Sequence, residues 1–131
     1  MNKGDILVYC IARDVNNTYV GWTNNWPRRL RQHNTDLVGG ARSTTMRYDA
    51  LRPWRPLFLV TGFGTKRHAR QLEWILHATH LPGARRSGKE TSVSWRLRRL
   101  AEAFALEGFT SSAPPTATAG LVTYHFDPPS E

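Results

Sequence analysis

Cysteine is almost missing from this sequence, since Cys10 is the only one among 131 residues. A lone cysteine excludes an internal disulfide and a cysteine-rich zinc site, and it fits a reducing compartment. The N-terminal stretch MNKGDILVYCIARD is too short in its apolar part for a signal peptide or a membrane span. We therefore expect an intracellular protein, of the cytoplasm or nucleus, that is not secreted and has no membrane partner.

Lysine and acidic residues are also scarce, and arginine supplies most of the positive charge. Arginine accounts for 15 of the 18 basic residues, against 10 acidic ones, and the formal net charge is +8. Guanidinium groups bind phosphate through paired hydrogen bonds, so this composition favours nucleic acid as the partner. The length allows one domain, and the 40% hydrophobic and 11% aromatic content favours a folded chain.

Strand-like and helix-like segments follow one another along the chain and predict a mixed α and β fold. Residues 6–12 and 18–22 are typical of a hairpin, and the apolar segment 57–63 of a strand covered on both faces. We expect helices over 27–34, 65–79 and 91–106, and a loop over 37–55. The predicted organisation is a domain over 1–110, followed over 111–131 by a linker, a late strand (121–126) and a tail packed on that domain.

The segment 18–34, TYVGWTNNWPRRLRQHN, contains the first candidate functional residues. Tyr19 ends a strand, and Gly21 allows a backbone or a phosphate to come close. Asn24 or Asn25 is suited to cap the helix that follows. Arg29 and His33 are four residues apart in that helix and share one face. A tyrosine beside an arginine and a histidine suits phosphodiester cleavage.

Glu73 stands out in the second predicted helix because it falls within the apolar stripe of Ala69, Leu72 and Leu76. A carboxylate that faces a core costs several kcal/mol, roughly, unless it is paired or binds a metal. One interpretation is a glutamate at the rim of the core, paired with an arginine. The other is a ligand for Mg²⁺, which commonly takes one or two protein carboxylates and completes its shell with water and phosphate.

These residues resemble the GIY-YIG endonuclease superfamily. The family's first motif matches Leu7-Val8-Tyr9, its second matches Tyr19-Val20-Gly21, and its later polar residues match Arg29, His33 and Glu73. The segments VYC, TYVGWT, RRLRQHN, GGARST, RPW, GF and LEW occur in the order found in the structure-specific subunits that cut branched DNA. The resemblance covers about residues 7–80. The first motif lacks the family's glycine, and with one cysteine this sequence cannot form the subfamily's RING-like zinc domain, so we do not expect its scaffold partner.

The resemblance implies a small three-stranded antiparallel sheet flanked by helices, with a C-terminal helix and a late strand. The implied reaction is metal-dependent hydrolysis of phosphodiester bonds in branched DNA during repair, recombination or replication, with Mg²⁺ as cofactor or Mn²⁺ in its place. Glu73 would hold the metal and Arg29 would clamp the phosphate. Tyr19 is the first choice for general base and Tyr9 the second, while His33 would orient water or phosphate. A phenol is a poor base at neutral pH, so a nearby cation such as Arg29, the metal or His33 is expected to favour its ionised form.

Further residues are expected to recognise the shape of the DNA and not its base sequence. They would do so through phosphate contacts, close approach of the backbone and stacking. They are Arg28, Arg31, Asn34, Gly39, Gly40, Arg42, Thr44, Trp54 and Arg67. Two alternatives stay open: a non-catalytic basic nucleic-acid-binding module on a nuclease-like fold, and a nuclease that processes RNA. The sequence leaves the oligomeric state and the preferred DNA structure undecided.

Overall fold

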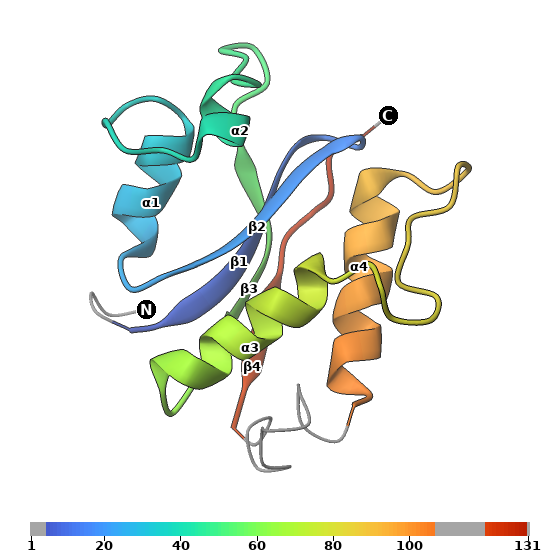
Figure 1. The fold of residues 1–131 in the computed structure, drawn as a ribbon. Helices are drawn as coiled ribbons and strands as arrows, with labels where there is room; N and C mark the ends of the chain where they lie inside the picture. The colour runs from blue at the N-terminus through green and yellow to red at the C-terminus, as the bar shows by residue number, and fades with distance from the viewer. Residues whose placement is uncertain (1–4, 107–119, 131) are drawn as a thin grey trace.

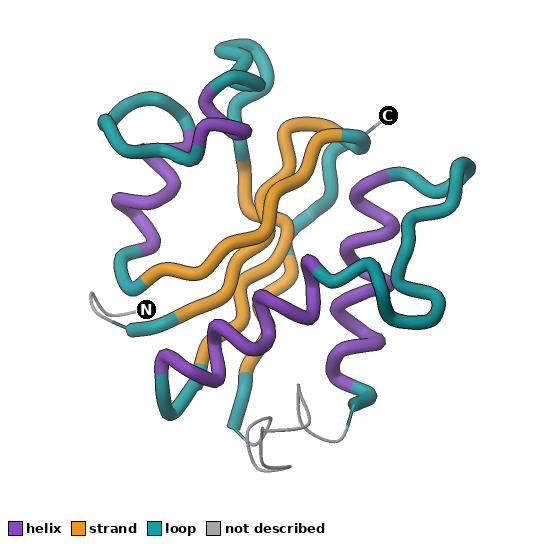
Figure 2. The backbone as a smooth tube through the Cα atoms, viewed as in Figure 1, coloured by secondary structure: helices purple, strands orange, loops and turns teal. Residues whose placement is uncertain are grey.

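A twisted sheet lies between two groups of helices (Figure 1). The computed structural model describes residues 5–106 and 120–130. Its elements are β1 (Leu7–Asp14), β2 (Asn17–Thr23), α1 (Trp26–His33), α2 (Arg42–Thr45), β3 (Arg55–Thr61), α3 (Lys66–His77), α4 (Ser92–Phe104) and β4 (Val122–His125). Figure 2 shows long loops on both sides of α2 and between α3 and α4. Within the described residues, no helix combines the length and the apolar character needed to cross a membrane.

The four strands form one antiparallel sheet in the order β2-β1-β3-β4. β1 lies in the interior of this sheet, and its residues from Leu7 to Ala12 are all buried. The pairing places Tyr9 opposite Gly21 on β2 and opposite Leu59 on β3. Tyr9 therefore lies in the middle of the sheet, directly opposite a glycine.

Each face of the sheet has its own hydrophobic core, because alternate residues of a strand point to opposite faces. The core under α3 and α4 contains, among others, Val8, Cys10, Val20, Leu72 and Leu100. The smaller core on the side of α1 is formed by Leu7, Tyr9, Ile11, Trp54 and Leu59. Figure 1 shows α1 and α2 on one side of the sheet and α3 with α4 on the other. Tyr9 thus belongs to the face that α1 covers.

Side-chain caps begin the three longer helices. Asn25 accepts a hydrogen bond from the backbone of α1, Thr65 from that of α3 and Thr91 from that of α4. Each cap satisfies a backbone N–H group that has no partner inside its own helix. Pro27 lies in the first turn of α1, where a missing N–H group costs nothing.

Two arginines of α4 are buried where this helix packs against α3. Arg96 donates to the Oγ1 atom of Thr18 at 3.0 Å and to the carbonyl of Leu76 at 3.4 Å. Arg99 donates to the carbonyl of Ile75 at 3.1 Å. These carbonyls belong to the last turn of α3, where such groups lack partners within the helix. The α4 arginines therefore tie α3 to β2 at the residue that precedes Tyr19.

The structure confirms the α+β class with an antiparallel sheet flanked by helices, but the sheet has four strands instead of three. The late strand β4 pairs with β3, from Phe58 opposite His125 to Thr61 opposite Val122. The segment 37–55, predicted as a loop, contains the short helix α2. One turn of Ser and Thr residues is too short to show a periodic apolar pattern. Residues 111–119 of the predicted linker lie outside the described residues, so the division into 1–110 and 111–131 stays a prediction.

Replacing Leu72 by Ala should lower the free energy of unfolding by about 2–5 kcal/mol, because its fully buried side chain would leave a cavity between α3 and the sheet. Urea unfolding followed by circular dichroism measures this change. Leu51→Ala is the matched control, since Leu51 is 91% exposed and should change stability by less than about 0.5 kcal/mol. Equal losses in the two variants would contradict this description of the core.

Candidate active site

A chain of hydrogen bonds connects the sheet to α1 and α2. The hydroxyl of Tyr9 lies 2.6 Å from Nε2 of His33, and Nδ1 of His33 lies 2.7 Å from Oγ1 of Thr44. The Thr44 hydroxyl donates at 2.8 Å to the carbonyl of Ala41. Tyr9, His33 and Thr44 are all fully buried. We call these three residues the Tyr9–His33–Thr44 chain.

The direction of each bond in this chain follows from the single hydrogen on Thr44. Because that hydrogen goes to Ala41, Oγ1 of Thr44 can only accept from His33, and Nδ1 of His33 therefore carries a proton. Burial, together with the charge of Arg29, lowers the pKa of His33 to about 4. The ring is neutral at pH 7, so its Nε2 atom accepts the hydrogen of the Tyr9 hydroxyl.

Tyr9 is thereby held as a neutral phenol. Burial raises the pKa of Tyr9 above its ordinary value, and the hydrogen bond from Arg29 only partly offsets this. For Tyr9, desolvation outweighs the charge of Arg29, so Arg29 by itself does not favour the ionised form. The predicted role of His33 needs correction. With both ring nitrogens engaged and no exposed surface, His33 positions Tyr9 and is out of reach of water or phosphate.

Arg29 points its guanidinium group at the same site. Its Nε atom donates to the Tyr9 hydroxyl at 3.2 Å, and its Nη1 atom donates to Oε1 of Gln32 at 3.1 Å and to the carbonyl of Gly39 at 3.0 Å. Its Nη2 atom has no hydrogen-bond partner among the described residues. The group is thus fixed on three sides and keeps one nitrogen available for an anion.

Tyr19 faces the same space from β2. Its ring lies 6.4 Å from the ring of Tyr9, 5.0 Å from that of His33 and 6.5 Å from that of His77 (centroid distances). Tyr19 is half-buried, and its hydroxyl makes no hydrogen bond within the described part of the chain. Of the two tyrosines, Tyr19 is therefore the one with a hydroxyl free to meet a substrate.

Gly21 makes room for this arrangement. A Cβ atom at this position would lie 2.5 Å from the hydroxyl oxygen of Tyr9 and 2.7 Å from its Cζ atom. It would also lie 3.2 Å from a ring carbon of Tyr19. Only glycine leaves both rings in place, which explains the glycine of the second motif by close approach and not by backbone conformation.

Glu73 lies on α3, half-buried, beside the fully buried Leu72. Burial raises the pKa of its carboxyl above the ordinary value, and Arg70 opposes this shift. Glu73 forms no ion pair with any described residue, so the interpretation of a glutamate paired with an arginine is not supported. Its charge contributes to the raised pKa of Tyr9, although much less than burial does.

Glu73 is a side chain near this site that could bind a divalent metal ion. In the described part of the chain, no three or more His, Cys, Asp or Glu side chains gather as a metal centre. Mg²⁺, however, is often bound by one or two protein carboxylates together with water and substrate phosphate. A half-buried carboxylate without an ion-pair partner fits that mode of binding. Glu73 is thus suited to hold an ion that it shares with a substrate.

The residues predicted to contact DNA fall into two groups. Arg28, Arg31, Gly39, Arg42 and Arg67 are exposed, and Gly40 is half-buried. Thr44 and Trp54 are buried, with exposed fractions of 0% and 1%, so neither can touch DNA in this structure. The prediction that Trp54 stacks on an unpaired base is therefore wrong. Asn34 is also engaged internally, since its side chain donates to and accepts from the backbone of Trp54.

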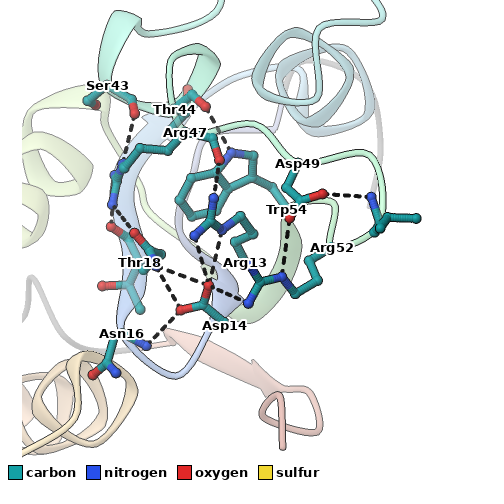
Figure 3. Close-up of polar contacts among 12 residues, drawn as sticks. Arg13, Asp14, Asn16, Thr18, Ser43, Thr44, Arg47, Asp49, Arg52 and Trp54 are labelled. Carbon is teal, nitrogen blue, oxygen red and sulfur yellow. Dashed lines mark hydrogen bonds and ion pairs between the residues drawn. The ribbon is translucent and has the colours of Figure 1, made fainter. Parts of the chain in front are cut away.

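Figure 3 shows what holds Trp54 and Thr44 in place. The indole Nε1 of Trp54 donates to the carbonyl of Thr44 at 3.1 Å, and the guanidinium of Arg47 lies over the Trp54 ring at 5.0 Å. Arg47 also donates to the carbonyls of Ser43 and Thr18. These contacts of Arg47 and Trp54 hold the segment around α2 against β2. They keep Thr44 within hydrogen-bonding distance of His33.

His77, which no motif in the sequence indicated, also borders the site. Its Nε2 atom lies 2.9 Å from the carbonyl of Val20, and its ring faces that of Tyr19 edge-on. Partial burial and the nearby charge of Arg96 lower the pKa of His77. Its spacing of four residues from Glu73 was a signal that could have identified it.

The model of the GIY-YIG catalytic domain matches residues 6–87, a span that includes the whole site described above. The chain belongs to the GIY-YIG family. This confirms the resemblance found in the sequence, and the two GIY-YIG motifs correspond to the strands that carry Tyr9 and Tyr19.

Curated relatives of this GIY-YIG domain include structure-specific endonuclease subunits. The subunit SLX1 homologue of Giardia intestinalis is 42% identical over 77 residues, which cover 56% of this chain and 20% of the relative. The subunit SLX1 of Chaetomium globosum is 39% identical over 106 residues (75% and 32%), and that of Phaeosphaeria nodorum 33% over 116 residues (70% and 31%). The chain therefore spans about a fifth to a third of the length of these relatives.

The buried, neutral His33 should make the GIY-YIG domain less stable in mild acid. His33 takes up a proton near pH 6.5 in the unfolded chain, but only near pH 4 in the folded chain. The free energy of unfolding therefore falls as the pH drops from about 6.5 to about 4. The loss should be on the order of 3 kcal/mol. Urea unfolding from pH 7 to pH 4 measures it, and His33→Gln should flatten the dependence by this amount. Identical pH slopes in the two proteins would contradict a neutral His33.

Proposed function

We propose that this GIY-YIG domain is an endonuclease that hydrolyses phosphodiester bonds in branched DNA, such as flaps, forks and junctions, in repair, recombination or replication. Membership of the family supports the reaction, and the relatives named as structure-specific endonuclease subunits support the substrate class. By the same proposal it acts inside the cell, wherever its DNA lies.

The observation that carries this proposal is a set of three unsatisfied groups around a fixed centre. The Tyr19 hydroxyl, Nη2 of Arg29 and the Glu73 carboxylate each lack a hydrogen-bond partner among the described residues. Arg29 donates to the Tyr9 hydroxyl, the Tyr19 ring lies 6.4 Å from the Tyr9 ring, and the charge of Glu73 contributes to the raised pKa of Tyr9. Tyr9 itself is fully engaged by His33 and Arg29. Groups held ready by such an arrangement can bind a phosphate without reorganising.

Each group has a distinct role in the proposed reaction. Arg29 binds the scissile phosphate through Nη2 and offsets the charge that grows in the transition state. Tyr19 accepts a proton from the attacking water as a phenolate, after its own hydroxyl proton has been lost to solvent. Tyr9 and His33 position Arg29 and do not exchange protons with the substrate. Glu73 holds a divalent ion, Mg²⁺ or Mn²⁺, which when bound neutralises charge on the phosphate and the leaving oxygen.

Exposed arginines are proposed to guide the DNA to this site. Arg28 and Arg31 lie on α1, the helix that carries Arg29, and Arg67 lies in the first turn of α3, the helix that carries Glu73. Phosphate contacts of this kind recognise shape and charge without reading the bases.

Glu73→Gln should reduce cleavage at least a hundredfold, roughly, while the affinity for DNA stays within about twofold. The measurement is nicking of labelled flaps, forks, four-way junctions, linear duplex and branched RNA with Mg²⁺, with Mn²⁺ and with chelator. Asp127→Asn is the control, since this exposed carboxylate lies beyond β4. Tight DNA binding without cleavage by the wild type would favour the non-catalytic binding module, and cleavage of RNA alone would favour the RNA-processing nuclease.

Arg31→Ala should weaken binding to every branched DNA by a similar factor and should lower the slope of log affinity against log salt concentration by about 1. Fluorescence anisotropy between 50 and 200 mM salt, roughly, would measure both quantities. Lys89→Ala removes the same charge from the exposed loop before α4, which Figure 1 shows across the sheet from α1. A matching change of slope in Lys89→Ala would mean that the net charge, and not the face around α1, attracts DNA.

A further inference from the structure

His77 reaches from α3 to the open edge of β2. The strand order places β2 at one edge of the sheet, and the carbonyl of Val20 accepts from Nε2 of His77 at 2.9 Å. The His77 ring lies 6.5 Å from that of Tyr19, at an interplanar angle of 71°. His77 therefore stands at the border of the proposed active site, on the side of Glu73.

The bond to Val20 determines which nitrogen of His77 is available. A carbonyl oxygen only accepts hydrogen bonds, so Nε2 of His77 carries the proton and Nδ1 of the neutral ring keeps its lone pair. No hydrogen bond to Nδ1 is formed by the described residues. Histidines that bind metals almost always donate their other ring N–H to a carbonyl or carboxylate, and the bond to Val20 has this form.

The spacing of Glu73 and His77 brings them to one face of α3. Residues four apart on a helix have Cβ atoms about 5–6 Å from one another, and side chains lean toward the N-terminal turn. Glu73 and His77 therefore share one face of α3, one turn apart. Pairs of ligands at this spacing hold metal ions on single helices in other proteins.

We propose that Glu73 and His77 together form a two-ligand site for a divalent cation, in which Nδ1 of His77 makes the site favour Mn²⁺ over Mg²⁺. This inference rests on the proposed role of Glu73 as metal ligand and adds a second ligand to it. A nitrogen donor strengthens binding to transition metals, whereas Mg²⁺ prefers oxygen donors only. The same site lies next to the Tyr19 ring, so the ion and the proposed base are neighbours.

A purely structural role for His77, as an anchor of α3 on β2, makes different predictions. His77→Gln keeps an N–H group that can donate to Val20 but exchanges the ring nitrogen for an amide oxygen. Under the proposal, this variant should bind Mn²⁺ about tenfold more weakly or worse, a loss comparable with that of other metal-site partners, and should bind Mg²⁺ as the wild type does. His80→Gln, three residues further on, is the matched control and should change neither affinity.

The experiment is a titration of the full chain with Mn²⁺ in the absence of DNA, read by electron paramagnetic resonance of free Mn²⁺ and by broadening of histidine ring signals in NMR spectra. We expect the His77 signals, assigned with the His77→Gln variant, to broaden before those of the other histidines. Equal Mn²⁺ binding by wild type and His77→Gln, or no selective broadening of His77, would overturn the inference.

Glu73→Gln separates this inference from the proposed function. Loss of Mn²⁺ binding in Glu73→Gln together with unchanged binding in His77→Gln would leave the metal role of Glu73 intact and remove only the second ligand. Unchanged Mn²⁺ binding in Glu73→Gln would instead contradict the metal role of Glu73, and with it the basis of both proposals.

Discussion

The buried imidazole of His33 is the constraint on which the site depends. One ring nitrogen binds Tyr9 from the middle of the sheet, and the other binds Thr44 from α2. A neutral histidine can accept with one nitrogen and donate with the other, so it fits between two hydroxyl groups that need opposite partners. The direction of every hydrogen bond in the Tyr9–His33–Thr44 chain follows from the donation of the Thr44 hydroxyl to the carbonyl of Ala41. The sheet, α1 and α2 are thus joined at a single ring.

The groups around this ring divide into those that are engaged and those that are available. Tyr9, His33 and Thr44 are buried and satisfied, while Tyr19, Arg29 and Glu73 are half-buried and retain free hydrogen-bonding capacity. Desolvation acts on both sets, since it keeps Tyr9 and His33 uncharged and raises the pKa of Glu73. In the proposed reaction, this neutral interior would leave Arg29 and Glu73 as the charged groups that face the substrate, with no competing charge on Tyr9 or His33 beneath them.

Much of this could be predicted from the sequence, and the exceptions have physical reasons. Strand alternation, helix caps and the motif spacing led to the α+β class and to the residues that surround Tyr9. They ranked Tyr19 before Tyr9 as general base, but they could not show that Tyr9 is buried and hydrogen-bonded while Tyr19 is half-buried. That difference depends on contacts with α1, which lies on another part of the chain. Trp54 was predicted to contact DNA from a segment that was expected to be a loop. Its burial depends on Arg47 and Asn34, contacts between segments that no local pattern reveals.

The buried arginines of α4 bear on how much of the chain forms an autonomous folding unit. The family match ends at residue 87, yet Val93, Leu100 and Ala103 of α4 belong to the larger core. Arg96 and Arg99 fasten that helix to the last turn of α3 and to Thr18. A fragment cut at the family boundary would expose this core to water and would lose folding cooperativity. The segment that the family model matches is therefore shorter than the unit that folds cooperatively.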